Sequence, residues 1–411
     1  MGQRSPEATL EEAVGLAEAI DLETAAGHII PIQAIKPSTY FGTGKVAEIG
    51  AVLRTEKADL AFVDADLSPV QQRNLEREWH VKVIDRTGLI LEIFADRART
   101  REGRLQVELA HLTYQRSRLV RSWTHLERQR GGLGFVGGPG ETQIEADRRI
   151  LQQKITRLEK DLDKVKRTRE LHRVKRHKAP HPVVALVGYT NAGKSTLFNA
   201  LTGASVEAQD LLFATLDPTM RVVRLPHGAD AILSDTVGFI ADLPTQLVAA
   251  FRATLEEVMF ADVILHVRDI SHPDTAVQAK DVAETLDLLG IDIETDRRVI
   301  EVWNKIDLVS DLGRVGDAAP ISALTGQGLD QLLLNIEERL SEYAQTYRVA
   351  VPASDGKLVA WLYDRVEVLE RQDRTGSEAG DDAFVELSLR VPPERADHFR
   401  AKAGPYIVQA D

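Results

Sequence analysis

Apolar positions in residues 28–98 alternate between the spacing of strands and the spacing of helices. Short β-branched runs predict strands at 29–35, 60–63 and 81–84. Apolar residues at helical spacing predict helices over 45–54 and 89–98. Before the third predicted strand, Ser68 and Pro69 supply an N-cap and a favourable first residue for a further helix. This alternation predicts a small parallel α/β domain.

Residues 99–180 carry a different pattern, in which apolar residues are spaced alternately by four and three positions. In the first segment the set is Leu105, Leu109, Leu112, Leu119, Trp123 and Leu126, interrupted at Arg116. In the second segment it is Leu151, Ile155, Leu158, Leu162 and Val165. Such a repeat keeps one helix face against a partner helix, so we expect an antiparallel helical hairpin. Thr142 and Glu145 form a capping-box pattern that predicts the start of the second helix.

The pattern also divides the remainder of the chain. Residues 1–27, polar and acidic in patches, predict a loosely ordered tail. Pro180-His181-Pro182 marks a boundary, and residues 181–345 alternate strands and helices in a second α/β domain. Residues 346–411 predict a small α+β domain, with a helix at 358–363, strands at 366–369 and 385–391, and a helix after Pro393.

Composition excludes several classes of protein. The chain has no cysteine, so it forms neither disulfides nor thiolate metal sites, which suits a reducing cytosol. It has no run of about 18 apolar residues, so we expect no membrane span. The N-terminus lacks the basic start and apolar core of a signal peptide. We expect a cytoplasmic monomer, with peripheral association at a membrane as an alternative location.

Charge is distributed unevenly along the chain. The net charge is −12, yet residues 99–178 hold 21 Lys and Arg against 10 Asp and Glu. A basic segment on an acidic protein favours a nucleic-acid partner for the hairpin, whereas a solvated Arg-rich helical face is the alternative. Residues 131–140 contain six glycines with Phe135 and Val136, more than a connector between two helices needs. Because glycine lets backbone approach a ligand closely, this loop favours a binding role.

The strongest chemical pattern begins at residue 188. The apolar run Val183–Val187 predicts a buried strand that leads into Gly188-Tyr189-Thr190-Asn191-Ala192-Gly193-Lys194-Ser195 and then a helix. This is the G-x-x-x-x-G-K-S phosphate loop in its strand–loop–helix setting. Backbone N–H groups can surround the phosphates, Lys194 can reach the β- and γ-phosphates, and Ser195 can offer its hydroxyl to Mg²⁺. The pattern predicts a Ras-like P-loop domain that binds a nucleotide.

Two later segments match the rest of a phosphate site. Asp235-Thr236-Val237-Gly238 follows an apolar strand, so that the carboxylate can support Mg²⁺ and the Gly238 N–H can meet the γ-phosphate. Before it lies Phe213-Ala214-Thr215-Leu216-Asp217-Pro218-Thr219, where Thr215 and Thr219 both have suitable spacing to ligate Mg²⁺. The residue after Gly238 is Phe239, whose ring cannot position water as a Gln would. We therefore expect slow hydrolysis until a partner reorders this region.

A third segment indicates which base is bound. A strand predicted at Val299–Val302 ends in Trp303-Asn304-Lys305-Ile306-Asp307, an N-K-x-D segment. The Asp307 carboxylate can accept hydrogen bonds from guanine N1–H and the 2-amino group, donors that adenine lacks. Backbone N–H groups of Ser322-Ala323-Leu324 can meet the guanine oxygen. The combination predicts a GTPase and not an ATPase.

With these residues in place, the chain resembles the HflX family of ribosome-associated GTPases over roughly residues 28–345. Outside the nucleotide segments, the resemblance rests on Thr39-Tyr40-Phe41-Gly42-Thr43-Gly44-Lys45. It rests more firmly on the hairpin, from Gln106-Val107-Glu108-Leu109 to Gln143-Ile144-Glu145-Ala146-Asp147-Arg148-Arg149. A hydrophobic residue after D-x-x-G is usual in this family, so Phe239 fits the pattern.

The resemblance implies a site for GTP or GDP with Mg²⁺, and it carries over residue by residue. The implied catalytic residues are Lys194, Thr215 and Gly238, and the implied Mg²⁺ ligands are Ser195 and Thr215. The implied nucleotide contacts are Gly188, Tyr189, Thr190, Asn191, Ala192, Gly193, Lys194, Ser195, Phe213, Ala214, Thr215, Leu216, Asp217, Asp235, Thr236, Val237, Gly238, Asn304, Lys305, Ile306, Asp307, Ser322, Ala323 and Leu324. Asn191 resembles the Asn of potassium-activated GTPases, which adds K⁺ dependence to the expectations.

The resemblance also implies a partner, the 50S ribosomal subunit and its rRNA, contacted through residues 99–178 during ribosome splitting, rescue or biogenesis under stress. Some members of the family are reported to bind ATP through the N-terminal region. Here Gly42-Thr43-Gly44-Lys45 is too short for a phosphate loop and is typical of a turn that starts a helix. Two alternatives stay open: a signalling GTPase with a protein partner, and an NTP-driven RNA-remodelling enzyme.

Overall fold

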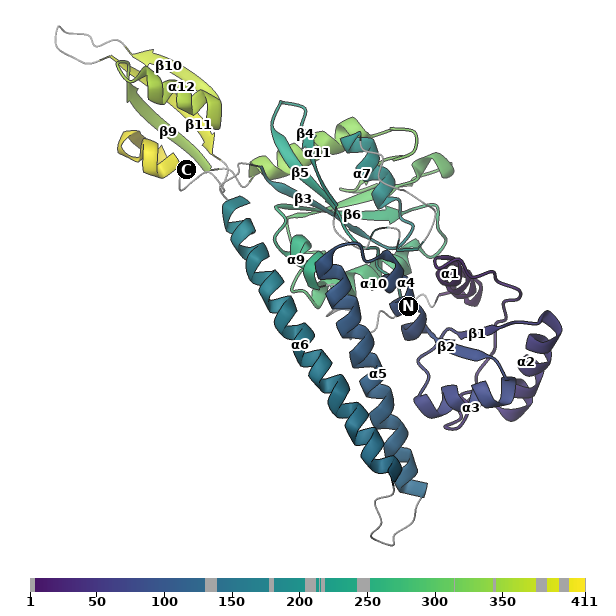
Figure 1. Ribbon diagram of the computed structural model, residues 1–411. Coiled ribbons are helices and arrows are strands. Elements are labelled where there is room, and N and C mark those ends of the chain that lie inside the picture. Colours follow the sequence, from purple (N-terminus) through teal and green to yellow (C-terminus); the bar gives the residue numbers. More distant parts are fainter. Residues whose placement is uncertain are drawn as a thin grey trace.

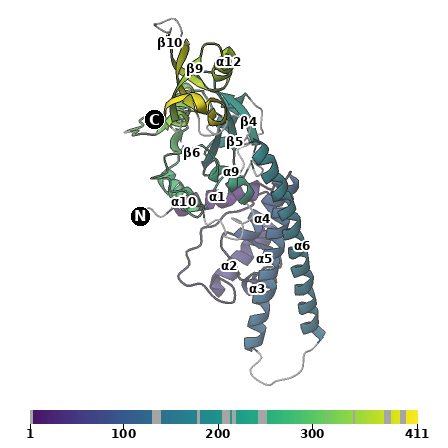
Figure 2. The same cartoon turned by 90° about the vertical axis from the view of Figure 1, so that its left-hand side faces the viewer.

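The computed structural model describes residues 4–129, 139–176, 181–203, 212–213, 215, 219–241, 252–313, 315–342, 345–374, 383–391 and 399–410. An N-terminal α/β domain, a long helical hairpin, a central α/β domain and a small C-terminal domain follow one another along the chain (Figure 1). The far end of the hairpin and the C-terminal domain lie at opposite ends of the molecule in both views (Figures 1 and 2). The α/β class and this arrangement of parts confirm the fold expected from the sequence.

The loosely ordered tail predicted over residues 1–27 is wrong for its described part. Pro6–Glu18 is a helix, α1, whose N-cap Ser5 accepts a hydrogen bond from the Ala8 N–H at 3.0 Å. Leu16 is fully buried in a cluster that also contains Leu89 of the last N-terminal helix. The other two buried residues of α1, Ala13 and Ala17, are alanines. Alanine adds little to a helical hydrophobic pattern, so the sequence gave only a faint signal for this buried helix face.

The N-terminal domain continues with α2 (Thr43–Glu56), β1 (Leu60–Val63), α3 (Pro69–Trp79), β2 (Lys82–Asp85) and α4 (Arg86–Arg97). The two strands pair in parallel, as predicted, and Ser68 forms a complete capping box with Gln71. The strand predicted at 29–35 is wrong, because no strand forms there and three of its four isoleucines, Ile29, Ile32 and Ile35, are exposed. Pro31 lies within that run and lacks the N–H that a β-ladder requires.

The predicted hairpin consists of α5 (Arg101–Gln129) and α6 (Pro139–Arg176), which lie side by side in both views (Figures 1 and 2). In α6, Ile155, Leu158 and Leu162 of the 4-3 repeat are buried. Arg116, which interrupts the repeat in α5, donates a hydrogen bond to Gln152 Oε1 of α6 at 2.6 Å. The interruption therefore carries a polar contact between the two helices.

The predicted start of the second hairpin helix needs a correction. The helix α6 begins at Pro139, so Thr142 lies inside it and is not its cap. Proline suits the first turn of a helix, because its missing N–H would have no partner there in any case. The glycine-rich loop lies largely outside the described residues, which resume at 139.

The central domain is built on a six-stranded sheet in the order β4-β5-β3-β6-β7-β8. Its strands are β3 (Val183–Gly188), β4 (Thr219–Arg224), β5 (Asp230–Asp235), β6 (Val263–Asp269), β7 (Val299–Asn304) and β8 (Ala319–Pro320). All neighbouring strands are parallel except β4 and β5. One face packs on α7 (Lys194–Thr202) and α11 (Leu329–Glu342), and the other on α9 (Arg252–Met259) and α10 (Thr275–Asp287). Helices on both faces explain why the central strands β3 and β6 are buried along most of their length.

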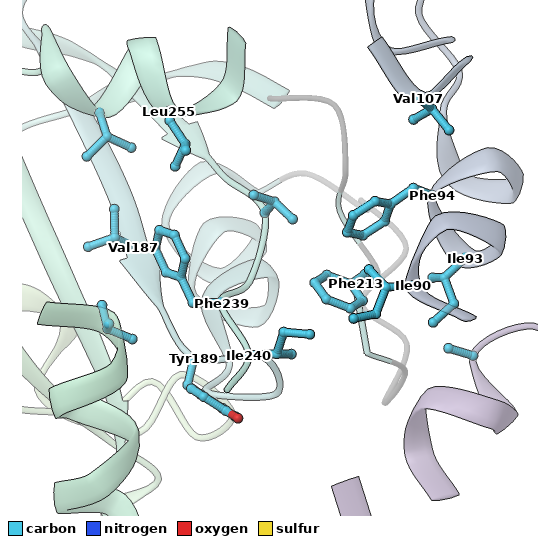
Figure 3. Close-up of a cluster of buried hydrophobic side chains, with 14 of the residues drawn as sticks. Ile90, Ile93, Phe94, Val107, Val187, Tyr189, Phe213, Phe239, Ile240 and Leu255 are labelled. Atoms are coloured by element: carbon cyan, nitrogen blue, oxygen red, sulfur yellow. The ribbon is translucent and has the colours of Figure 1, made fainter. Parts of the chain in front are cut away.

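One apolar cluster continues from the central domain into the N-terminal domain and the hairpin. We call it the interdomain cluster; it includes Ile90 and Phe94 of α4, Val107 of α5, and Phe213 and Phe239 of the central domain. The Phe94 and Phe213 rings meet edge to face with centroids 4.9 Å apart (Figure 3). The N-terminal domain thus packs directly on segments that were predicted to contact the nucleotide.

The C-terminal domain has its own core, and its sheet is antiparallel in the order β10-β11-β9-β12. Its elements are β9 (Gln345–Pro352), α12 (Gly356–Arg365), β10 (Glu367–Arg374), β11 (Phe384–Val391), a 3₁₀ turn (Gly404–Tyr406) and β12 (Ile407–Ala410). The sequence predicted α12, β10 and β11 but missed the other two strands. Residues 399–403 are helical, whereas the residues just after Pro393 lie outside the described part. Within the described chain, no helix is long and apolar enough to cross a bilayer.

Candidate nucleotide site

Two glycines give the loop after β3 its shape. Gly188 ends β3 with a φ of 153°, and a Cβ atom there would lie 2.2 Å from the Val267 carbonyl oxygen. Gly193 begins the turn into α7 with a φ of 89°, and a Cβ atom there would lie 2.3 Å from Asn304 Nδ2. Neither position accepts a side chain, because each needs both a positive φ and a close approach of neighbouring atoms. The loop therefore curls tightly at the N-terminus of α7, where N–H groups and the helix dipole favour an anion.

Lys194 is buried beneath this loop. Its Nζ donates hydrogen bonds to the carbonyl oxygens of Gly188, at 3.1 Å, and Tyr189, at 2.7 Å. Burial lowers the pKa of Lys194 to about 8, although the nearby Asp235 carboxylate opposes the shift. The ammonium is still mostly charged at neutral pH, and a polyphosphate beside it would stabilise that form further.

Ser195, Thr215 and Asp235 bring three oxygen-bearing side chains together. The Ser195 and Thr215 hydroxyls lie 3.1 Å apart and donate to Asp235 Oδ2 at 2.7 and 2.9 Å. Burial raises the pKa of Asp235, against the opposing hydrogen bonds from Ser195 and Thr215 and the charge of Lys194. Thr219, the alternative to Thr215, lies instead at the start of β4, where its backbone is opposite that of Asp235 in the antiparallel β4–β5 pair.

These residues fit Mg²⁺, which the family resemblance implies. Asp235 Oδ1 is buried without a hydrogen-bond partner in the described structure, so an acceptor remains for a metal-bound water. Mg²⁺ prefers oxygen ligands and usually takes one or two from the protein, with the rest from phosphates and water. No group of three or more His, Asp and Glu that could hold a metal by itself occurs among the described residues. The Ser195 and Thr215 hydroxyls would hold the ion, which would neutralise phosphate charge.

Gly238 lies tightly against the phosphate loop. A Cβ atom there would approach the Thr190 Cα to 2.9 Å and Lys194 Nζ to 3.1 Å. The Thr190 N–H donates to the Phe239 carbonyl at 2.7 Å, and the Phe239 N–H donates to the Gly188 carbonyl at 3.1 Å. The Phe239 side chain is buried in the interdomain cluster (Figure 3) and does not line the nucleotide pocket. Its ring is thus a packing group.

The N-K-x-D segment closes the other end of the site. Asn304 donates from Nδ2 to the Ala192 carbonyl at 2.8 Å and accepts the Ala323 N–H at 3.0 Å. This one amide ties the phosphate loop to the segment after β8. Lys305 has a φ of 65° and pairs with Asp269 at 2.7 Å, which orients its side chain along the site.

The predicted segments surround one pocket with a volume of about 350 Å³. It is lined by Thr190, Asn191, Gly193, Lys194, Ser195, Thr196, Phe213, Thr215, Thr236, Gly238, Asn304, Lys305, Asp307, Leu308, Ala323 and Leu324. The sequence missed Thr196 and Leu308, which directly follow two recognised motifs. The other described predicted contacts are not among the residues that line this pocket: Gly188, Tyr189, Ala192, Asp235, Val237, Ile306 and Ser322. Ala214, Leu216 and Asp217 lie outside the described residues.

A parallel sheet, a phosphate loop at its central strand and an N-K-x-D segment at the far end of the same pocket define a P-loop GTPase. Four family models match the chain in succession. They are described as GTP-binding GTPase N-terminal (residues 7–95), GTP-binding GTPase Middle Region (97–176), 50S ribosome-binding GTPase (183–305) and HflX C-terminal domain (307–410). The first match begins within α1, so the family's N-terminal domain includes this helix, which packs against α4.

Sequence relatives agree with these matches. The GTPase HflX of Magnetococcus marinus is 52% identical over 390 residues, which cover 93% of this chain and 88% of the relative. The GTPase HflX of Escherichia coli is 45% identical over 368 residues, covering 88% and 84%. A GTP-binding protein of Sulfolobus solfataricus in complex with GDP is a structural neighbour at 25% identity, covering 80% and 94% with a TM-score of 0.44. The chain belongs to the HflX family of GTPases, and it is a GTP phosphohydrolase.

Proposed function

We propose that this GTPase is a GTP-switched factor that binds the 50S ribosomal subunit through its basic hairpin. The observation that carries the proposal is the hairpin itself, where residues 99–178 hold 21 basic against 10 acidic residues in a chain of net charge −12. The hairpin projects away from the central domain (Figure 1), and Lys154, Arg157 and Lys160 are exposed along α6, where rRNA phosphates can reach them. The family model for residues 183–305, described as a 50S ribosome-binding GTPase, supports the same partner.

In this proposal the site residues have distinct roles. Lys194 stabilises charge on the β- and γ-phosphates, and the Gly238 N–H meets the γ-phosphate. Ser195 and Thr215 hold Mg²⁺ beside Asp235. Asp307 reads guanine through two hydrogen bonds that adenine cannot make. Because Phe239 is buried away from the pocket, water has to be aligned by other groups, which fits slow hydrolysis without a partner.

The test is multiple-turnover GTP hydrolysis with and without 50S subunits, using charge reversal in the hairpin. Lys154 and Arg157 are exposed on α6, and the double change to Glu should weaken 50S binding about tenfold or more while leaving hydrolysis without ribosomes unchanged. The matched control reverses exposed Lys280 and Arg297 on the central domain. If the two pairs of substitutions weaken 50S binding equally, the hairpin is not the contact surface for the ribosome.

Ionic strength distinguishes this proposal from its alternative. Binding through phosphates releases counterions, so affinity for 50S subunits should fall steeply with salt, and the hairpin variant should have a shallower slope. Absence of any 50S stimulation, with tight GTP binding retained, would instead favour a signalling GTPase with a protein partner.

A further inference from the structure

Tyr189 belongs to the phosphate loop, yet its side chain faces away from the nucleotide pocket. It follows Gly188 at the end of β3, and its ring is buried beside Phe239 and Ile240 at the edge of the interdomain cluster (Figure 3). Its backbone carbonyl accepts the Lys194 ammonium at 2.7 Å. One residue therefore contacts the phosphate-binding lysine through its backbone and the domain boundary through its side chain.

The Tyr189 hydroxyl is the centre of a buried polar network. It accepts the Ala241 N–H at 2.8 Å and a hydrogen bond from Arg4 Nη2 at 2.5 Å, and it donates to Glu12 Oε2. Burial and the adjacent Glu12 charge raise the pKa of Tyr189, so the hydroxyl keeps the proton that it donates. Burial alone would raise the pKa of Glu12, but Arg86 and the hydrogen bonds hold it below its usual value. Glu12 thus remains an acceptor at neutral pH.

The same network also holds the Ala241 carbonyl oxygen. Arg86 of α4 donates from Nη2 to the Ala241 carbonyl at 2.9 Å and to Glu12 Oε1 at 2.5 Å. Arg4 also pairs with Asp281 of α10 at 2.7 Å. We call Arg4, Glu12, Arg86, Tyr189 and Ala241 the switch joint. Arg86 of the N-terminal domain therefore bonds the Ala241 carbonyl directly. The Ala241 N–H is bonded to Tyr189, whose hydroxyl is in turn bonded to Arg4 and Glu12.

This arrangement fixes the segment after Gly238 at two points. The backbone of Phe239 is hydrogen-bonded to Gly188 and Thr190, and the Ala241 N–H is bonded to Tyr189. Gly238 itself lies directly against Thr190 and Lys194. A displacement of the Tyr189 hydroxyl would release the second point and let the Gly238 N–H drift from its place. Small errors of this kind are costly in catalysis, because donors must be placed before charge develops.

We propose that Tyr189 is a positioning residue for GTP hydrolysis, whose hydroxyl is oriented by Arg4 and Glu12 and sets the backbone of residues 238–241 against the phosphate loop. The inference rests on the proposed roles of Lys194 and Gly238 in the nucleotide site. It adds that the N-terminal domain helps to position the residues for GTP hydrolysis, by orienting the hydroxyl of Tyr189.

The test compares Tyr189→Phe with Tyr114→Phe in the full-length protein. Tyr114 is a matched control, because its hydroxyl also donates to a buried carboxylate, Asp85, and its ring also lies against an arginine, Arg118. It has no part in the nucleotide pocket. We expect Tyr189→Phe to lower kcat for GTP about tenfold, because a displaced Gly238 N–H would bond the charge that develops in the transition state less well, with KM and GDP affinity within about twofold. Tyr114→Phe should leave kcat unchanged.

Each other outcome counts against the inference. Equal kcat values for wild type and Tyr189→Phe would overturn it, as would a parallel loss of GDP affinity, which indicates general damage to the phosphate loop. If Tyr189→Phe does not fold, Glu12→Gln keeps the hydroxyl but removes the charge that orients it, and kcat should fall about threefold with amide exchange at 239–241 accelerated. Unchanged kcat and exchange in that variant would contradict the inference.

A separate arm tests the site on which the inference depends. Lys194→Ala should abolish hydrolysis if the proposed nucleotide site is right. Hydrolysis retained in Lys194→Ala would refute the site, whereas loss in Lys194→Ala with full activity in Tyr189→Phe would refute only the role of Tyr189.

Discussion

Two joints in this molecule use nearly the same chemistry. In the switch joint the Tyr189 hydroxyl donates to Glu12, with the Arg4 guanidinium 5.0 Å from the ring centroid. In what we call the hairpin joint, Tyr114 of α5 donates to Asp85 at 2.5 Å, with Arg118 4.4 Å from its ring centroid. Each joint buries a phenol, a carboxylate and an arginine where two parts of the chain meet.

The joints differ in what else the carboxylate and the phenol hold. Asp85 caps α4 by accepting the Gly88 N–H at 2.9 Å and pairs with Arg118, so its partners lie on regular helices. The Tyr189 hydroxyl instead holds Ala241, three residues beyond Gly238 in the segment beside the phosphates. The same set of groups therefore fixes the hairpin in one place and links the N-terminal domain to the nucleotide site in the other.

The largest expected effect separates the joints through stability. Asp85→Ala should cost about 3–5 kcal/mol, because Asp85 is fully buried and its loss removes the carboxylate that accepts from Arg118, Tyr114 and the Gly88 N–H. Hydrogen exchange of α4 in urea measures this loss, and Asp85→Asn, which keeps the cap, should cost less. GTP turnover below the unfolding transition should be unchanged. A fall in kcat in the folded variant would mean that the hairpin joint also reaches the nucleotide site.

How far the sequence could predict these joints depends on the range of the interactions. The phosphate loop, D-x-x-G and N-K-x-D segments are local, because their chemistry lies in consecutive residues after predicted strands. The hairpin joint was not predicted, because the helix after the strand at 81–84 was expected to begin at 89 and no N-cap was assigned to Asp85, which caps α4 in the structure. No sequence signal linked Glu12 to Tyr189, which is 177 residues away. Long-range polar pairs of this kind become apparent only when tertiary packing is known.

One error in the sequence analysis and one missed role have the same physical origin. The polar character of residues 1–27 predicted a tail, yet Arg4 and Glu12 are polar because they enter a buried ion network. The sequence indicated that the Phe239 ring cannot position water, but it gave no sign that the ring packs in the interdomain cluster. Polarity and aromaticity alone do not indicate whether a residue faces solvent, a ligand or another domain.

The next prediction sharpens the comparison on the apolar side of the switch joint. Phe94 contacts Phe213, which is two residues before Thr215, so Phe94→Leu should loosen that segment and cost about 1 kcal/mol of stability. We expect affinity for a non-hydrolysable GTP analogue to fall about fivefold, with GDP affinity unchanged, measured by calorimetry. Phe399→Leu is the matched control, because Phe399 is equally buried against Tyr347 in the C-terminal domain. A similar change in that control would attribute the effect to general destabilisation.

The smallest expected effect concerns acid and tests whether Glu12 is charged in its joint. Its pKa lies below the ordinary 4.5, since burial is outweighed by Arg86 and the hydrogen bonds. The folded protein therefore binds fewer protons here than the unfolded chain, so this stabilisation is present above pH 4.5 and is lost as pH falls through the depressed pKa.

The variant Glu12→Gln tests this pH dependence, because it lacks the charge at every pH. The stability difference between wild type and Glu12→Gln, on the order of 1 kcal/mol near neutrality, should shrink toward zero in acid. Urea titrations of both proteins across this pH range measure the difference in stability. The control is Glu48→Gln, which removes the charge from the exposed Lys45–Glu48 ion pair and should leave stability almost unchanged at every pH. A difference that stays constant in acid would mean that Glu12 acts through shape and hydrogen bonding alone, and that the two joints differ in geometry and not in charge.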